Sequence, residues 1–538
     1  KLQMGATGSS PSCCFFRRFF ILLALGCADG GRLLVVPQDG SHWLSMRVLV
    51  DRLAQRGHYI VVAIPEVNML FKDLDNYKVK TFSSPYSKDV LENRMRRMNQ
   101  EIFVDRILTE KITFWYESMS NATQWVVSAC QHFLQNSTLI RELEKEHFDA
   151  MLTDSVFPCG EIVAEHLSIP SVSFMRGTIF GMDQIASQTP SPPSYVPRMF
   201  TVYTDNMSFS QRVKNFLIHS LEHIVCHIFY YPYAQMASDF LKKEVTAMSL
   251  FSRTSIWLMR YDFVFEFPRP IMPNVILIGG INCAKQKALP QEFEKLVKSS
   301  GEHGFVVFSF GSMVSEIPMN IAMDIAEALR YIPQKVFWRY TGKAPPNLGD
   351  NTHLVKWLPQ NDLLAHPKAR AFITHAGSHG VYEGICNAVP MVMLPLIGDQ
   401  MDNAKRIESR GAGLILNVQN LIPDDLSNAV MAVIDNPSYK ENIQRLSSLH
   451  RDRPVQPLDL AVHWVEFVMK HKGAPHLRPA AHDLNWIQYQ SLDVMAFLLA
   501  VLLTTLFISL KCSTFACRCC CKRNTKPKRK TKSDIATH

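Results

Sequence analysis

The stretch from Trp357 to Gln400 constrains the fold of this chain more than any other part of its sequence. It contains two dense apolar runs, AFIT and PMVMLPL, with the length and flanking turn residues of buried parallel strands. Between them, HAGSHGVYE forms a glycine-containing turn that opens a short helix, where free backbone N–H groups and the helix dipole favour an anion. Ligands of open α/β sheets bind at the carboxyl ends of strands. The stretch therefore predicts an anion or nucleotide site on a parallel sheet.

Polar and aromatic side chains stand at successive loop positions of this α/β unit. They are Trp357, Gln360, His375, Glu383, Asp399 and Gln400. A glycine turn alone is weak evidence, because many strand–helix turns need glycine for steric reasons. The combination of the turn with these side chains favours a binding site over a purely structural turn.

Two successive series of β/α units predict two similarly built α/β domains. Apolar runs that indicate strands occur at 31–37, 59–64, 148–154 and 170–177, and again at 305–310 and 335–340. A polar, charged stretch over 284–303 separates the two series. We therefore expect a first domain over residues 29–283, a linker at 284–303 and a second domain over 304–474.

Residues 75–136 are rich in aromatic residues and methionine with helical periodicity. The pattern fits helices that line an apolar cleft, and it fits ordinary core helices equally well, because amphipathic stripes mostly belong to cores.

Both ends of the chain carry membrane signals. Arg17 and Arg18 precede an apolar run that ends in small residues near Ala28, which predicts a signal peptide over residues 1–28. The uncharged run Val494–Leu510 has about the 25 Å length, as a helix, of a span across a thin bilayer such as that of the endoplasmic reticulum. Residues 475–493 connect the body to this span, and they either return to the first domain or lie on the membrane surface.

The formal net charge of +9 resides almost wholly in the tail at 511–538, which holds nine Lys/Arg residues and one acid. The rest of the chain is close to neutral, so the basic balance does not indicate a nucleic-acid-binding surface. Basic residues that follow a span predict a cytosolic tail and a luminal body, which is a type I topology. The C-terminal SDIATH has no lysine at the usual dilysine positions.

Five of the 13 cysteines lie in the body: Cys130, Cys159, Cys226, Cys283 and Cys386. So few in so long a body do not indicate a disulfide framework, and no Cys/His spacing indicates a zinc site. The tail cysteines beside the span are either palmitoylated or unmodified thiols. Glycosylation sequons occur at Asn121, Asn136 and Asn206.

Two residues at strand ends of the first domain form a candidate acid–base pair. His42 follows the first strand on an expected loop beside Gly40 and Ser41, and Asp154 ends the strand at 148–154. Strand ends of a parallel sheet converge, and a carboxylate that orients an imidazole also stabilises the imidazolium. We therefore predict that His42 is a general base and that Asp154 supports it.

From about residue 31 to 510 the chain resembles the animal UDP-glucuronosyltransferases, family 1, the phenol and bilirubin type. The resemblance is carried by DGSHWLSM, LTDSVFPCG, IMPNVILIGGINC, FSFGSMVSEIP, WRYTG, APHLRPAAHDL and the stretch from Trp357 that ends in DQMDNA. It implies a GT-B fold of class α/β, in which two Rossmann-like domains face a cleft, plus a C-terminal transmembrane helix. Residues 29–283 would then bind the acceptor and residues 304–474 the UDP-sugar.

The resemblance assigns a UDP-sugar site to matching residues. Those expected around the uridine are Ser309, Gly311, Ser312, Arg339, Trp357, Gln360 and Glu383. Those expected at the diphosphate are His375, Gly377, Ser378, His379 and Gly380. Those expected at the sugar are Asp399, Gln400 and, for a sugar carboxylate, Arg260. An aromatic plane suits a base, carboxylates suit vicinal diols, and a helix N-terminus suits a leaving diphosphate.

The activity that the resemblance implies is transfer of glucuronic acid from UDP-glucuronate to a hydroxyl of small lipophilic acceptors, with inversion to a β-glucuronide. It implies no metal and no cofactor beyond the co-substrate UDP-glucuronate. Two alternatives are a transferase of UDP-glucose or UDP-N-acetylglucosamine, and a catalytically silent nucleotide-sugar-binding partner. The presence of both His42 and Asp154 argues against the silent partner. We expect an endoplasmic reticulum membrane protein that associates with itself or with related transferases.

Overall fold

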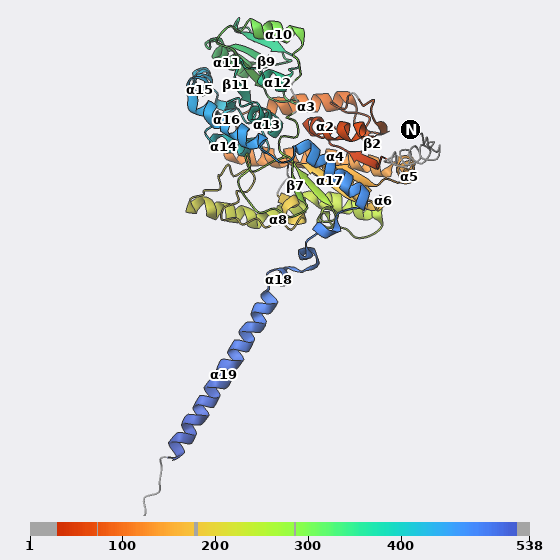
Figure 1. Cartoon of the computed structure of the whole chain (residues 1–538), viewed down its shortest axis with the longest axis vertical. Coiled ribbons are helices and arrows are strands. Elements are labelled where there is room, and N and C mark those ends of the chain that lie inside the picture. The colour runs from red at the N-terminus through yellow and green to blue at the C-terminus, as the bar shows by residue number, and fades with distance from the viewer. Residues whose placement is uncertain (1–29, 73, 177–180, 284–286, 524–538) are drawn as a thin grey trace, which may run out of the picture. The chain divides into compact units, whose positions relative to one another are not determined.

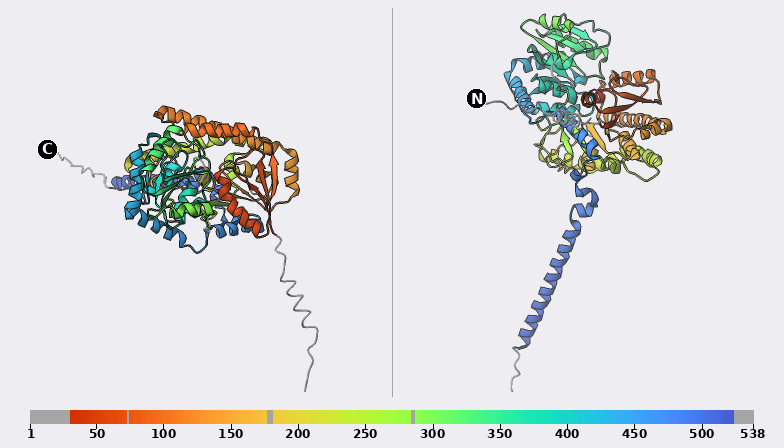
Figure 2. Two further views of the ribbon diagram at one scale, coloured as in Figure 1. Left: turned by 90° about the horizontal axis from the view of Figure 1, so that it is seen from above. Right: turned by 45° about the vertical axis from the view of Figure 1, so that its right-hand side comes forward.

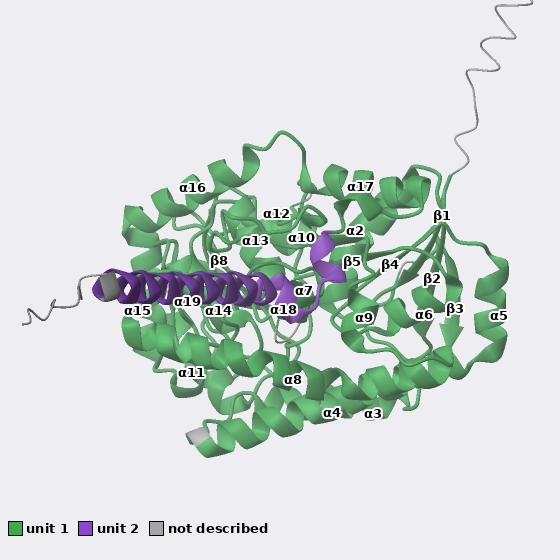
Figure 3. Ribbon diagram, turned by 90° about the horizontal axis from the view of Figure 1, so that it is seen from below, with its two compact units in different colours: residues 1–478 green, residues 479–538 purple. Residues whose placement is uncertain are grey.

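A computed structural model describes residues 30–72, 74–176, 181–283 and 287–523. The expected signal peptide over 1–28 and the last part of the basic tail lie outside the described residues. The chain forms two compact units, one up to Arg478 and one from Pro479 onward (Figure 3).

The first half of the body is built on a parallel sheet of seven strands in the order β3-β2-β1-β4-β5-β6-β7. The strands are β1 (Arg32–Val36), β2 (Tyr59–Pro65), β3 (Lys78–Phe82), β4 (Ala150–Thr153), β5 (Ser171–Met175), β6 (Ile256–Met259) and β7 (Val275–Leu277). The chain reverses its direction of travel across the sheet between β1 and β4, which pair directly. These central strands are almost wholly buried, as their continuous apolar runs predict.

Helices cover both faces of this first sheet. They are α2 (Ser41–Gln55), α3 (Lys88–Glu101), α4 (Leu108–Gln135), α5 (Ser137–Lys145), α6 (Cys159–Leu167), α7 (Met182–Ala186), α8 (Phe209–Leu241) and α9 (Ala247–Phe251). In α2, Trp43, Met46, Leu49, Val50 and Leu53 are buried at the spacing of one helix face. The expected helices in 75–136 are α3 and α4; that they line a cleft stays a prediction.

The second half is built on a parallel sheet of six strands in the order β10-β9-β8-β11-β12-β13. The strands are β8 (Phe305–Ser309), β9 (Lys335–Arg339), β10 (Thr352–Val355), β11 (Ala369–Thr374), β12 (Met391–Met393) and β13 (Gly413–Ile415). Figure 2 shows the strands of the two sheets as separate groups, the first red to yellow-green and the second green to cyan. Here the reversal falls between β8 and β11, so both sheets are doubly wound.

The helices of the second half begin earlier than the expected domain boundary. They are α10 (Gln291–Lys298), α11 (Met319–Arg330), α12 (Gln360–Leu364), α13 (Ser378–Cys386), α14 (Gln400–Glu408), α15 (Pro423–Asp435) and α16 (Pro437–Arg451). The expected linker at 284–303 contains α10, which buries Phe293 and Val297 in the core of the second sheet. Together with Leu296, these two residues form the apolar face of a helix whose other residues are polar or charged, so this stretch packs against the second sheet.

The helix α17 (Pro457–His471) corrects the expected end of the second domain at residue 474. Its buried residues Val462, Val465 and Val468 join the core cluster of Leu33 and Leu49 in the first sheet. In Figure 1 this blue helix lies among the red and orange elements of the first half. The apolar face of α17 needs a partner, and the side of the first sheet that also carries α2 supplies it.

Two disulfides correct the expectation that the body has no disulfide framework. Cys130 in α4 is bonded to Cys159 in α6, with Cα atoms 5.8 Å apart, and Cys283 is bonded to Cys386 in α13, with Cα atoms 6.1 Å apart. The partners are 29 and 103 residues apart in sequence, so no local spacing reveals them. Cys226 stays a buried thiol.

The C-terminal unit contains α18 (Trp486–Tyr489) and the long helix α19 (Leu492–Arg523). Residues Leu492–Cys521 are long and apolar enough to cross a membrane, which agrees with the predicted span over 494–510. The helix continues beyond Leu510 through the first tail cysteines, Cys512 to Cys521.

Candidate active site

His42 and Asp154 lie side by side at the ends of β1 and β4, the two strands between which the strand order of the first sheet changes direction. Nδ1 of His42 lies 2.6 Å from Oδ2 of Asp154. Asp154 follows β4 and is buried, whereas the His42 side chain is 35% exposed. His42 lies in the first turn of α2 and not on a loop as expected, because Gly40, with a φ of +82°, turns the chain directly into the helix. A carboxylate at Nδ1 holds the imidazole with Nε2 free to accept a proton.

A second carboxyl group, which the sequence did not single out, lies behind this pair. Glu161 in α6 is 3% exposed, and neither of its carboxyl oxygens has a hydrogen-bond partner among the described residues. Burial, with a smaller contribution from the charge of Asp154, raises the pKa of Glu161 to about 7, against an opposing contribution from the nearby Ser155 hydroxyl. Glu161 is therefore protonated over much of the acidic to neutral range.

The predicted anion turn lies between β11 and α13, next to the reversal of the second sheet. A Cβ atom at Gly311 would lie 2.6 Å from Cε1 of His375, and one at Gly377 would lie 2.5 Å from Nε2, so both positions require glycine. Burial lowers the pKa of His375 to about 4, which leaves the ring neutral at physiological pH. Its Nδ1 atom is buried and has no partner among the described residues.

Arg339 at the end of β9 shapes the loop that follows β8. Its Nη1 donates to the carbonyl of Gly311 at 2.5 Å and its Nη2 to the carbonyl of Ser312 at 3.1 Å. Ser309 Oγ accepts a hydrogen bond from the N–H of Gly311 at 3.1 Å. The guanidinium also lies 5.1 Å from the ring centroid of Trp357. The structure therefore brings these predicted residues together.

The remaining residues expected around the uridine are also neighbours. Trp357 is 54% exposed, so one of its faces is open to a ligand. The amide of Gln360, in the first turn of α12, donates to the buried carboxylate of Glu383 in α13. An accessible aromatic ring next to an oriented carboxylate suits a nucleoside.

The expected sugar end lies at the start of α14. Asp399 precedes this helix, and Oε1 of Gln400 accepts hydrogen bonds from the N–H groups of Leu396 and Ile397 at 2.8 and 3.0 Å. Arg260, after β6, is buried, and its Nε has no acceptor among the described residues. Burial lowers the pKa of Arg260, and the charges of Asp154 and Asp399 oppose that effect. Arg260 thus interacts electrostatically with a carboxylate of each half, Asp154 of the first and Asp399 of the second.

His379 links the two sheets in addition to its place at the turn. Its Nδ1 lies 3.1 Å from Oγ of Ser45 in α2 and 3.0 Å from Nδ2 of Asn282, and its Nε2 lies 3.5 Å from Oε1 of Glu383. Ser378 and Gly380 lie with it in the first turn of α13. The His42 helix therefore contacts the helix that carries the anion turn.

Comparison with known proteins identifies the family. The model of the family described as UDP-glucoronosyl and UDP-glucosyl transferase matches residues 31–527. The chain is 55% identical to human UDP-glucuronosyltransferase 1A6, over 96% of this chain and 97% of that protein. The chain belongs to the UDP-glucuronosyltransferases of family 1. It is also 56% identical to the mouse 1A6 protein, over 93% of this chain and 94% of that one.

Two solved structures confirm the predicted GT-B fold of this UDP-glucuronosyltransferase family member. The glycosyltransferase VinC, solved with DTDP, superposes with a TM-score of 0.54 at 17% identity, over 82% of this chain and 99% of that one. The forosaminyltransferase SpnP superposes with a TM-score of 0.55 at 17% identity, over the same shares of the two chains. At this identity the likeness shows the fold alone.

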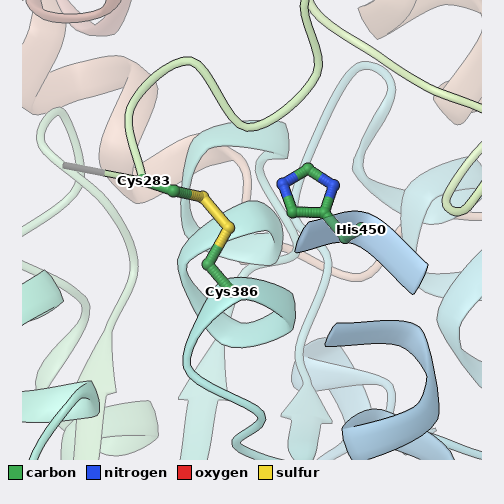
Figure 4. A group of neighbouring side chains, drawn as sticks. All are labelled: Cys283, Cys386 and His450. Carbon is green, nitrogen blue, oxygen red and sulfur yellow. A yellow bond between two sulfur atoms is a disulfide. The ribbon is translucent and has the colours of Figure 1, made fainter. Parts of the chain in front are cut away.

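Among the described residues of this family member, one group of potential metal ligands lies at the end of α13. Cys283, Cys386 and His450 place one ligand atom each within 4.8 Å of one another (Figure 4). The two sulfur atoms are bonded to each other, and Nδ1 of His450 lies 2.6 Å from Oδ2 of Asp262. With the disulfide formed, Cys283 and Cys386 are a covalent cross-link between the segment after β7 and α13.

Sequence reasoning missed two residues at the contact between the sheets, Arg176 and Asn403. Asn403 is fully buried, the Arg176 side chain is 15% exposed, and the two residues hydrogen-bond to each other. Asn403 lies in the quoted DQMDNA segment, three residues after Gln400, which is the only local signal for it. Arg176 follows β5, so it shares the strand-end position that indicated Asp154.

Proposed function

We propose that this chain transfers glucuronic acid from UDP-glucuronate to a hydroxyl group of small lipophilic acceptors. The observation that carries the proposal is the His42–Asp154 pair. The helix of His42, α2, contacts α13, the helix that follows the anion turn, through Ser45 and His379. Base and anion turn thus belong to one site, with the base from one sheet and the turn from the other.

In the proposed reaction, Nε2 of His42 removes the proton of the acceptor hydroxyl as its oxygen attacks the anomeric carbon. The bond from that carbon to the UDP oxygen breaks, and the electron pair leaves with UDP. Asp154 stabilises the imidazolium, and the N–H groups at the start of α13 hold the growing charge of the diphosphate. A single displacement inverts the α-linked donor to a β-glucuronide.

The residues proposed to bind the donor keep the roles that the family resemblance implies. Trp357 stacks on uracil, Gln360 lies beside it and Glu383 binds the ribose hydroxyls. Asp399 and Gln400 bind the sugar hydroxyls. The others are Ser309, Gly311, Ser312 and Arg339 around the nucleotide, His375 with Gly377, Ser378, His379 and Gly380 at the diphosphate, and Arg260 at the sugar carboxylate.

Arg260 supports glucuronate as the sugar. A buried guanidinium whose Nε has no acceptor among the described residues is costly, and a sugar carboxylate would satisfy it. UDP-glucose offers a neutral hydroxymethyl group at the same position and would leave the group unpaired.

We further propose a type I location in the endoplasmic reticulum membrane, with α19 as the span, the body in the lumen and the basic tail in the cytosol. The candidate span and the positive charge that follows it support this orientation. An oxidising lumen also suits two disulfides in the body. Association with copies of the chain or with related transferases, and glycans at the three sequons, stay predictions.

Microsomes that contain the full chain test the proposal directly. They are supplied with a phenol and, separately, with UDP-glucuronate, UDP-glucose and UDP-N-acetylglucosamine. We expect β-glucuronide formation with UDP-glucuronate and little turnover with the others. Turnover with UDP-glucose alone would overturn the glucuronyl assignment, and UDP binding without turnover would favour a silent partner.

A further inference from the structure

Asn403 joins three parts of the site through one side chain. It lies in α14 and is fully buried. Its Nδ2 donates to the carbonyl of Ala376 at 3.1 Å and to Oδ2 of Asp399 at 2.9 Å. Its Oδ1 accepts a hydrogen bond from Nη2 of Arg176 at 3.1 Å. Both amide protons and the oxygen are therefore used.

The first partner, Ala376, has an unfavourable backbone conformation. Its φ is +61°, in the left-handed region that residues with a Cβ atom rarely adopt, and it lies between His375 and Gly377 in the anion turn. Such a conformation persists only when surrounding contacts hold it. The bond from Asn403 to the carbonyl of Ala376 is a contact of this kind, and it comes from outside the turn.

The second and third partners extend the network to the sugar end and to the first sheet. Asp399 is 33% exposed, so only one side of its carboxylate is fixed by Asn403 and the other stays open to a ligand. Arg176 comes from the end of β5 and also donates from Nη2 to Oε2 of Glu266 at 3.1 Å. Its Nε lies 3.9 Å from Oδ2 of Asp399.

We propose that Asn403 is a positioning residue for the donor. Its bond to Ala376 holds the strained turn in the conformation that presents N–H groups to the diphosphate. Its bond to Asp399 orients that carboxylate toward the sugar. Its bond to Arg176 fixes the position of the turn and of Asp399 relative to the first sheet. This inference rests on the proposed function, which places the diphosphate at the turn and the sugar at Asp399. A buried amide with a purely structural role would affect stability and leave the donor constants of the folded protein unchanged.

The test uses the full membrane-bound chain with the isosteric substitution Asn403→Asp. The new carboxylate donates nothing to Ala376 and faces the carboxylate of Asp399. We expect the KM for UDP-glucuronate and the inhibition constant of UDP to rise by about tenfold or more, since each buried hydrogen bond lost is worth a sizeable factor. The acceptor KM at saturating donor should stay within about twofold.

Asn351→Asp is the matched control. The amide of Asn351 donates to the backbone carbonyls of Leu329, Ile332 and Gln334. Asn351 precedes β10, so it lies at the opposite end of this strand from Trp357, which follows β10. This variant loses partly buried hydrogen bonds of an amide to backbone carbonyls, so it should inactivate at a lower temperature while its donor constants match those of the wild type.

A second substitution separates the two contacts of the Asn403 amide. Glycine adopts a positive φ without penalty, so in Ala376→Gly the turn no longer needs the hydrogen bond from Asn403 to keep its conformation. In the double variant Ala376→Gly/Asn403→Asp, the UDP inhibition constant should return most of the way to the wild-type value. The KM for UDP-glucuronate should stay raised, because Asp399 still lacks its partner.

Unchanged UDP and UDP-glucuronate constants in Asn403→Asp would overturn the inference, and so would equal shifts in the Asn351→Asp control. If Asn403→Asp does not accumulate, the double variant decides, since an unchanged KM for UDP-glucuronate there also overturns it. Failure of the proposed function would give a different result. The wild type itself would not turn over UDP-glucuronate, while direct measurement of UDP binding would still test Asn403.

Discussion

His42 and Asp154 are 112 residues apart in sequence, yet their Nδ1 and Oδ2 atoms are 2.6 Å apart at the reversal point of the first sheet. The pairing of Val36 with Thr153 in adjacent parallel strands brings them together, because each catalytic candidate follows its strand by a few residues. The N–H of Asp154 extends the same pairing with a hydrogen bond of 3.3 Å to the carbonyl of Val36. The position of His42 relative to Asp154 thus depends on strand register.

We predict that Asp154→Asn lowers kcat by about 10²- to 10⁴-fold and leaves the KM for UDP-glucuronate nearly unchanged, because an amide cannot stabilise the imidazolium. His42→Ala should abolish turnover while UDP binding survives. The control is Asp149→Asn, which changes a carboxylate just before the opposite end of β4. Initial rates over a donor series measure these constants. Substantial turnover by His42→Ala would rule out the assigned base.

Substitution of Arg260 by methionine should change donor preference. Loss of a charged partner for the sugar carboxylate is worth about 1.5–3 kcal/mol, or roughly 10- to 150-fold in the kcat/KM for UDP-glucuronate. UDP-glucose, which has no carboxylate, should lose far less. The measured quantity is the ratio of kcat/KM for the two donors in one membrane preparation. An equal loss of kcat/KM with both donors would mean that Arg260 supports the structure of the site and does not bind the sugar carboxylate.

Glu161 should make the stability of the protein depend on pH. Because its pKa is raised to about 7 in the folded state, from an ordinary value near 4.5, the folded protein keeps this proton over a range in which the unfolded chain has lost it. Stability therefore falls as the pH rises from about 4.5 to about 7, by roughly 3 kcal/mol in total. Glu161→Gln should remove this slope and make the protein more stable than the wild type above pH 7.

The temperature of half-inactivation, measured in membranes from pH 5 to pH 8, tests this prediction. The exposed residue Glu441 supplies the control, and Glu441→Gln should follow the wild-type profile throughout. A Glu161→Gln profile parallel to the wild type would show that this carboxyl group does not titrate between the two pKa values.

The disulfide Cys283–Cys386 should stabilise the body by about 2–4 kcal/mol, because it closes a long loop in the unfolded chain. We expect Cys283→Ser/Cys386→Ser to inactivate at a lower temperature, and a reductant to affect it less than the wild type. Cys226→Ala, which removes a buried thiol outside any disulfide, is the control for a loss of packing. A reductant effect of equal size in both proteins would show that this bond does not contribute to stability.

Local sequence patterns located the central strands of both sheets and part of the candidate site. Continuous apolar runs between turn residues located β1, β8 and β11, since each strand is buried on both faces. The same reasoning located His42 and the glycine turn at His375, because ligands gather where parallel strands end. It placed His42 on a loop, although the residue lies in a helix, because helix starts lack a periodic signal of their own.

The sequence by itself determined the α/β alternation, the candidate membrane span and the residue types at the strand ends, because apolar periodicity, turn residues and charge act over short distances along the chain. Only the tertiary structure decided that α17 returns to the first sheet, that Cys283 bonds to Cys386, and that Asn403 joins Arg176 to Asp399. Each of these contacts involves groups on separate elements, and all three link residues more than 100 positions apart in sequence. Their free energy depends on burial and geometry that exist only once both sheets have packed.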